Sequence, residues 1–442
     1  MITIKRVFKN ASWIVFSKLI KAILTLIVTM IMARKLGPNN YGLINYAASL
    51  VSFIIPVMKL GIDSTLVHDI INHPHEEGKY VGTSIIANVI SGLLCILGII
   101  VFVLFANCGE TETIIVCSLY SITLLFQAIE IVQYWFQAKL LSKYPSIAML
   151  IAYIITSLVQ ILILLFGGNI YLFAISYSLE FLIISFMLLF LYKKDSPQKL
   201  DYSFDTFKLI FNKSKYYIIA SMMITIFAHT DKIMIKFMIG NENVGYYSAA
   251  LTCASMFSFV FAAIIDSFRP VIFEKKKVSN KQFEKYITSL YSIIIVGSLT
   301  VSLLMTIFSS LIISIMYGSE YNASISALKI IVWYTTFSYL GSIRNIWIII
   351  ENKQNLLWKI NLYGAILNIV LNLILIPIIG INGAAIASLL TQIFTNCILG
   401  FLMKTISYNN KFMINSIKPS NLKNIYNVLK TINKSEGKYE RD

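Results

Sequence analysis

The chain consists of long apolar runs separated by short polar segments. Each run is close to the ~20 residues that an α-helix needs to cross a bilayer. Twelve such runs cover residues 12–33, 42–62, 82–106, 114–136, 146–166, 170–192, 215–239, 243–268, 286–308, 325–349, 358–377 and 384–407. Turn-forming residues such as Gly167-Gly168-Asn169 occupy the gaps between them. The pattern predicts an all-α polytopic membrane protein with about twelve transmembrane helices.

Composition excludes an ordinary soluble enzyme. Of the 442 residues, 57% are hydrophobic and 13% are charged, whereas soluble domains carry about 25% charged residues. The five cysteines show no CxxC spacing, so neither a disulfide framework nor a zinc site is predicted. The stretch His73-Pro74-His75 fits a solvated loop better than a metal site. Without a phosphate-binding loop or a catalytic constellation, we expect no enzyme activity, no cofactor and no metal.

The distribution of Lys and Arg predicts the orientation. Of 37 such residues, 28 lie in or beside alternate gaps, two lie in the other gaps, and seven lie within the runs. Cytoplasmic loops carry the excess of positive charge, so both termini are predicted to be cytoplasmic. The net charge of +16 therefore reflects basic loops and a basic tail, 408–442, drawn to anionic membrane lipids. Nucleic acid is not an expected partner.

An internal repeat relates the two halves. Residues 36–47 and 239–250 both place glycines five positions apart after an apolar run, at an offset of 203 residues. Gln137-Ala138-Lys139 likewise matches Glu351-Asn352-Lys353. We therefore predict two parallel six-helix bundles, 1–192 and 215–407, joined by a cytoplasmic linker, 193–214, and followed by the tail. Parallel repeats around a central cavity are typical of alternating-access carriers.

Three motifs carry a family resemblance. Ala33-Arg34-Lys35-Leu36-Gly37-Pro38 with Tyr41-Gly42, the stretch from Asp231 to Ala250, and Tyr317-Gly318-Ser319-Glu320-Tyr321 resemble signatures of polysaccharide biosynthesis flippases. These belong to the multidrug/oligosaccharidyl-lipid/polysaccharide (MOP) exporter superfamily, and the Wzx-type O-antigen (repeat-unit) flippases look most similar.

The resemblance implies a multi-pass protein of the bacterial cytoplasmic (inner) membrane. It would move undecaprenyl-diphosphate-linked oligosaccharide from the cytoplasmic to the outer leaflet, for O-antigen, capsule or exopolysaccharide synthesis. Its partners would be the polymerase and the glycosyltransferases of the same pathway.

Cations within the apolar runs are the candidate contacts for the diphosphate, because a charge at the bilayer centre costs ~2.5–3.5 kcal/mol on insertion scales. Lys21 lies ~13 Å into the first run at 1.5 Å per residue. Lys18 shares its face and could also reach the headgroups by snorkelling. The candidates for the diphosphate or the cavity are Lys18, Lys21, Lys59, Lys232 and Arg344.

Acids within the runs are candidates for coupling to H⁺ or Na⁺. Asp231 either faces the cavity or pairs with a lysine of another helix. Glu130 and Glu180 either couple transport or hydrogen-bond between helices.

Two other functions remain open. A multidrug or cation extrusion antiporter of the same superfamily should favour acids, whereas seven cations stand here against four acids within the runs. A membrane-embedded polysaccharide polymerase would need a long outer loop, and the predicted outer loops are short.

Overall fold

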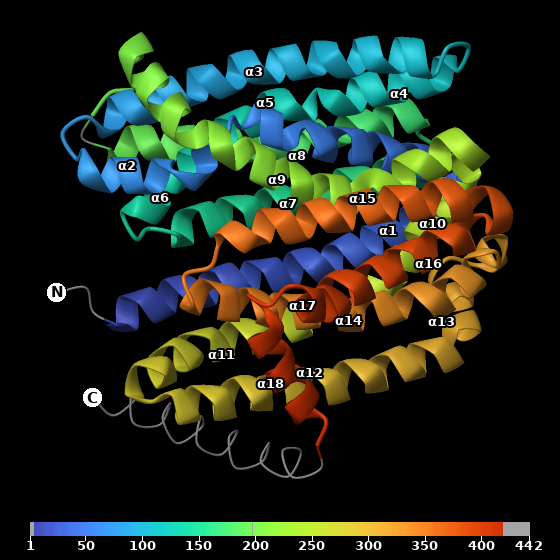
Figure 1. Ribbon diagram of the computed structural model, residues 1–442. Helices are drawn as coiled ribbons and strands as arrows, with labels where there is room; N and C mark the ends of the chain where they lie inside the picture. Colours follow the sequence, from blue (N-terminus) through green and yellow to red (C-terminus); the bar gives the residue numbers. More distant parts are fainter. Residues whose placement is uncertain (1–3, 197, 419–442) are drawn as a thin grey trace. The chain divides into compact units, whose positions relative to one another are not determined.

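The computed structural model describes residues 4–196 and 198–418, with side chains from residue 19 onward. Every regular element in these ranges is helical. The chain packs as two compact units, Met1–Ser248 and Ala249–Asp442, whose helices are drawn in Figure 1. The prediction of an all-α protein is confirmed for the described residues. The two six-helix bundles with a linker at 193–214 remain a prediction.

The first unit comprises ten helices and the start of an eleventh. They are α1 (Ile4–Met58), η1 (Ile62–Ser64), α2 (Leu66–Asn72), α3 (Glu77–Ala106), α4 (Thr111–Ser121), α5 (Thr123–Ile129), η2 (Glu130–Val132), α6 (Gln133–Ala138), α7 (Lys143–Leu165), α8 (Ile170–Asp195), α9 (Phe204–Ile239) and the beginning of α10 (Asn241–Ser255). Its core includes Trp135, Phe136 and Tyr192, all nearly inaccessible to solvent. Large apolar side chains on α3 are exposed instead, with Phe105 83% accessible, which fits contact with hydrocarbon.

The second unit continues with shorter elements between long helices. They are α11 (Ser258–Val278), α12 (Asn280–Ile307), α13 (Ser309–Met316), η3 (Ser319–Tyr321), α14 (Ser324–Ile350), α15 (Asn355–Ile379), α16 (Ile381–Ile393), the π-helix η4 (Phe394–Ile398), α17 (Leu399–Leu402) and α18 (Ser407–Ser416). Helices α12, α14 and α18 share a core that contains Tyr291 and Trp347. The Tyr291 hydroxyl is 3.2 Å from Asn409 Oδ1.

Eight helices in the described part of the chain are long and apolar enough to cross a membrane, or nine if a pair bent by 42° is one span. They correspond to eight predicted runs, from 82–106 through 170–192 and at 215–239, 286–308, 358–377 and 384–407. The bent pair, α10 and α11, corresponds to 243–268. The runs 12–33, 42–62 and 325–349 are helical as well, within α1 and α14. A polytopic membrane protein is thus supported, while the number twelve and the cytoplasmic termini remain predictions.

The repeated motif adopts the same backbone in both halves. The helix α1 is broken at Gly37, which has φ 72° and ψ 172°, and α9 ends at Gly240 with φ 91° and ψ 174°. These left-handed positions favour glycine, and they are 203 residues apart, as the sequence match predicts.

The second sequence match needs a correction of register. The left-handed residues after the conserved turn geometry are Leu140 (φ 57°) and Asn352 (φ 54°). The amides of the residues that follow donate to carbonyls five positions earlier, Leu141 to Phe136 and Lys353 to Ile348. The equivalent turns are therefore 212 residues apart, not 214. Two polar residues of similar type misled the ungapped comparison, whereas the helix end is defined by its backbone.

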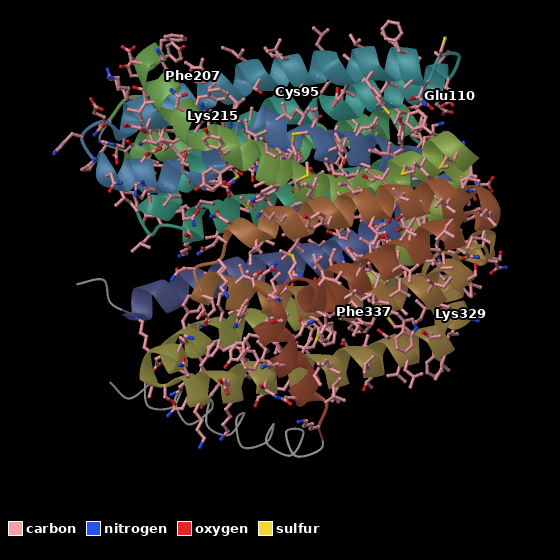
Figure 2. All side chains as sticks on the ribbon, in the orientation of Figure 1. Cys95, Glu110, Phe207, Lys215, Lys329 and Phe337 are labelled. Carbon is pink, nitrogen blue, oxygen red and sulfur yellow. The ribbon has the colours of Figure 1, made fainter. Side chains whose placement is uncertain are left out.

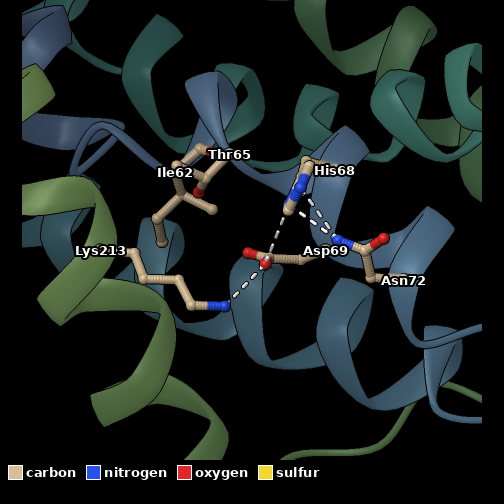
Figure 3. A network of polar contacts seen from close by, with 6 residues as sticks. All are labelled: Ile62, Thr65, His68, Asp69, Asn72 and Lys213. Atoms are coloured by element: carbon tan, nitrogen blue, oxygen red, sulfur yellow. Dashed lines mark hydrogen bonds and ion pairs between the residues drawn. The ribbon is translucent and has the colours of Figure 1, made fainter.

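Helix α9 packs against α1 and α3 of the first unit. Near its start, Lys213 Nζ lies 3.0 Å from Oδ1 of Asp69, a carboxylate of α2 that is only 1% exposed (Figure 3). The Ser214 hydroxyl donates to the carbonyl oxygen of Leu60 at 2.8 Å. These contacts explain why the first unit extends through α9 to Ser248.

Candidate functional site

Lys21 is the candidate cation whose surroundings are most informative. Its Nζ lies 2.7 Å from Glu180 Oε1 on α8 and 4.7 Å from the ring centroid of Tyr153 on α7. The lysine side chain is 48% exposed, whereas that of Glu180 is 9% exposed. One face of the ammonium is therefore held by protein, and the other is open to a ligand. Lys18 lies on the same helix, but its side chain is outside the described residues.

The second candidate cation, Lys59, follows the end of α1. It contributes to a pocket of about 200 Å³ formed by α3, η1 and the segment from α5 to α6. Its Nζ is 3.8 Å from Asp63 Oδ2, and Glu130 lies across the same pocket. Glu130 is within electrostatic range of both Lys59 and Lys21. The structure thus brings two candidate cations and the acids Glu130 and Glu180 together in the first unit.

The charged residues of α9 face the second half of α1. Lys232 Nζ donates to Asn45 Oδ1 at 3.2 Å, and Lys236 lies 6.0 Å from the ring of Tyr46. Both lysines therefore share a face, as their spacing predicts. The neighbouring Asp231 accepts a hydrogen bond from the Tyr247 hydroxyl at 2.5 Å. A neutral hydroxyl leaves the carboxylate its full charge, so Asp231 retains the property required of an ion-coupling group.

Glu110, in the loop between α3 and α4, was not among the predicted site residues. Figure 2 shows it at the end of the first unit opposite to Phe207 and Lys215. Its Oε2 is 2.6 Å from Lys236 Nζ. Burial acts to raise the pKa of the Glu110 carboxyl, but hydrogen bonds from Lys236, Thr113 and Asn107 bring this pKa below its ordinary value. A lone acid in a short predicted outer loop was the only sequence signal for this contact.

Arg344 belongs to the second unit and is buried, with 5% of its surface exposed. Its Nη1 donates to the carbonyl oxygen of Thr395 at 2.7 Å, and its Nη2 donates to Asn345 Oδ1 at 3.1 Å. Thr395 lies in the π-helix η4, where the altered hydrogen-bond register leaves carbonyls to be satisfied. No ion pair of Arg344 is found among the described residues, and its Nε has no hydrogen-bond partner there. Backbone capping is thus the role that the geometry supports for this side chain.

Several uncharged residues of the site escaped the sequence analysis. Asn88, Gln127, Gln133 and Tyr134 line the pocket beside Lys59, and Tyr153 contacts both Lys21 and Thr25. An asparagine within a predicted span was the available signal. Which neighbours it meets depends on how four helices rotate about their axes, and residue spacing alone does not determine this.

Comparisons with known proteins place this geometry in a family. The sequence profile described as "Polysaccharide biosynthesis protein" matches residues 7–276. The capsular polysaccharide biosynthesis protein CapF of Staphylococcus aureus is 24% identical over 398 residues, which cover 87% of this chain and 96% of that protein. A probable low-salt glycan biosynthesis flippase of Haloferax volcanii is 26% identical over 197 residues, covering 43% of this chain and 40% of that one.

Solved structures share the fold. The lipid II flippase MurJ in an inward closed conformation matches with a TM-score of 0.73 and 17% identity, over 91% of this chain and 90% of that one. An inward-facing multidrug resistance MATE family transporter of the MOP superfamily matches with a TM-score of 0.64 and 13% identity, over 90% and 96% of the two chains. Since the family profile spans well over half of the 442 residues, the chain belongs to the polysaccharide biosynthesis protein family of the MOP superfamily.

Proposed function

We propose that this protein is a flippase that moves undecaprenyl-diphosphate-linked oligosaccharide from the cytoplasmic to the outer leaflet of a bacterial cytoplasmic membrane. The oligosaccharide serves capsule, O-antigen or exopolysaccharide synthesis, and the two repeats alternate access to it without chemical change. The protein acts with the polymerase and glycosyltransferases of the same pathway. Family membership and the fold shared with flippases support this proposal.

The observation that carries the proposal is the half-exposed ammonium of Lys21. A diphosphate crossing hydrocarbon needs fixed cations in place of water, because an unpaired charge there is costly. Lys21 keeps one side on Glu180 and presents the other outward. Arrival of a diphosphate lets this lysine exchange a carboxylate for a phosphate oxygen, so that an ammonium without a partner never forms. Lys232, bound only to an amide oxygen in the described contacts, is a second contact for the anion.

Coupling to H⁺ or Na⁺ is assigned within this proposal to Asp231. Glu180 is engaged with Lys21 and Glu130 lines the pocket beside Lys59, whereas Asp231 accepts from a neutral tyrosine hydroxyl.

A leaflet assay tests the proposal. In a deletion strain complemented with wild type or Lys21→Ala, the exposure of the lipid-linked oligosaccharide is measured with a membrane-impermeant glycosidase on right-side-out and inverted vesicles. We expect the glycolipid to accumulate facing the cytoplasm in the deletion and in Lys21→Ala, and to be cleared by wild type. Lys329→Ala, which removes an exposed lysine of α14, is the matched control and should behave as wild type. An unchanged leaflet distribution on deletion, in a strain without a second flippase, would point to drug extrusion instead.

A charge exchange separates binding from a purely structural role of Lys21. The double variant Lys21→Glu with Glu180→Lys restores an ion pair between α1 and α8 but moves the cation to α8. Transport should stay lost although the protein remains folded. Recovery of transport would show that the ion pair matters only for packing.

A further inference from the structure

The pocket beside Lys59 has a composition that differs from that of an anion site. It contains one cation, Lys59, and two acids, Asp63 and Glu130. Their formal charges sum to −1, or to zero when Glu130 holds a proton. A diphosphate would therefore meet no attractive field here, and Lys59 is already turned toward Asp63 at 3.8 Å. The occupant that suits this pocket is uncharged or weakly basic.

Hydrogen-bonding capacity in the pocket exceeds what the protein itself uses. Asn88 is 1% exposed, and its Oδ1 has no hydrogen-bond partner among the described residues. Leaving such a buried acceptor empty is costly, on the order of 1–3 in kcal/mol terms for a typical group, which indicates a ligand donor at this position. Gln127 adds a further amide, with both a donor and acceptors. Gln133 donates to Glu130 Oε1 at 3.2 Å, which orients that carboxylate.

Shape and size narrow the ligand further. The ring of Tyr134 and the side chain of Ile131 supply apolar surface beside the polar groups. A pyranose has the matching character, because its hydroxyls both donate and accept while its C–H faces are apolar. The volume of about 200 Å³ is below the ~300–1,000 Å³ typical of pockets for drug-sized ligands. A single sugar ring therefore fits better than a whole oligosaccharide.

We propose that the pocket formed by Lys59, Asp63, Asn88, Gln127, Glu130 and Tyr134 is a subsite for one sugar ring of the lipid-linked head group. This inference rests on the proposed function and deepens it. The residues lie at the end of the first unit that the Lys and Arg distribution predicts to be cytoplasmic, where the substrate enters. Lys59 and the two acids read hydroxyl or amino groups of the sugar, while Lys21 holds the diphosphate. The subsite makes transport depend on the identity of the sugar as well as on the lipid.

The test compares two lipids on the purified full-length protein in nanodiscs. One is undecaprenyl diphosphate, and the other is undecaprenyl-diphosphate-linked oligosaccharide extracted from the deletion strain. Wild type should bind the oligosaccharide form more tightly. Asn88→Leu and Gln127→Leu should weaken that binding about tenfold, as loss of a buried hydrogen bond implies, and leave binding of undecaprenyl diphosphate unchanged. Gln160→Leu, which alters a buried glutamine of α7 outside the pocket, should match wild type with both lipids.

Each other result has a distinct meaning. If Asn88→Leu and Gln127→Leu keep the wild-type preference for the oligosaccharide form, the sugar subsite is wrong while the flippase proposal stands. Equal weakening of both lipids also overturns the subsite, since these residues would then support the fold or the diphosphate site. If wild type binds neither lipid and moves none between leaflets, the proposed function itself fails.

Discussion

At the scale of single residues, the charges within the spans differ in what they contact. Lys21 contacts a carboxylate, Lys232 an amide oxygen, and Arg344 a backbone carbonyl. A carboxylate or an amide can be exchanged for a phosphate oxygen at little structural cost. A carbonyl of a π-helix cannot, because releasing it leaves a buried acceptor without a partner. The lysines of the first unit are therefore better suited to transient anion binding than the arginine of the second.

The pair of Glu110 and Lys236 gives a prediction about pH. Since the pKa of Glu110 is lowered in the folded protein from its ordinary value of 4.5, the pair stabilises the fold fully above pH 4.5. Its contribution is lost as the pH falls through the lower folded-state pKa. Because the Glu110 side chain is 46% exposed, we expect at most about 1 kcal/mol from it.

Thermal unfolding of wild type and Glu110→Gln in detergent checks this expectation. The difference in Tm should be present at pH 7 and shrink as the pH is lowered below 4.5. Glu112→Gln, which changes an acid two residues further along without an ion pair among the described residues, serves as the control. A difference in Tm that does not depend on pH would contradict the assignment.

At the scale of elements, the two repeated turns pack against each other reciprocally. A Cβ at Gly42 would overlap the carbonyl oxygen of Asn241, and a Cβ at Gly245 would overlap the carbonyl oxygen of Pro38. Each glycine thus meets the residue that is equivalent to the one its counterpart meets, at the same offset of 203 residues. The repeated glycines are required by this close approach of backbone to backbone, which only a residue without a side chain permits.

Gly42→Ala and Gly245→Ala should each destabilise the protein by about 1–3 kcal/mol, because the added methyl group overpacks against rigid backbone. Gly98→Ala is the matched control, since a Cβ there meets no atom within 4 Å. In the interior of α3 this change should be neutral, or stabilising by up to about 1 kcal/mol. Unfolding temperatures measured in the same detergent compare the three variants. Wild-type stability of Gly42→Ala would mean that the turns can separate freely.

At the scale of the whole molecule, the compact units do not divide at the middle of the sequence repeat. Helix α9, which the repeat assigns to the second half, is joined to the first unit along its length by Lys213, Lys232 and Lys236. Each of these lysines contacts a residue more than 120 positions away in the sequence. Charge pairing between distant helices therefore decides where the compact unit ends.

Lys213→Ala should loosen the beginning of α9, because it leaves the buried carboxylate of Asp69 with only His68 nearby, at 3.9 Å (Figure 3). The lysine is 47% exposed, so we expect a loss of about 1–3 kcal/mol. Hydrogen–deuterium exchange of residues 204–215 should speed up. Lys208→Ala, which changes an exposed lysine of the same helix, should leave the exchange unchanged. Equal exchange in both variants would show that apolar packing alone holds α9.

The sequence by itself determined the class of fold and the candidate charges. A backbone in hydrocarbon must satisfy its hydrogen bonds within one segment, so long apolar runs specify helices with little dependence on their neighbours. The same physics marks Lys21, Lys232 and Asp231 as exceptional, because each charge is costly there. The repeated glycines were visible for a related reason, since their backbone conformation is local.

Only the tertiary structure decided which groups meet. Lys21 and Glu180 are 159 residues apart, and Asn88 reaches the pocket beside Lys59 only through the packing of α3 against its neighbours. Contacts of this kind depend on the rotation and depth of each helix, and lipid-facing and protein-facing surfaces are both apolar in this chain. Hydrophobic pattern therefore cannot indicate which face turns inward, and the pairing of charges and the pocket followed from packing alone.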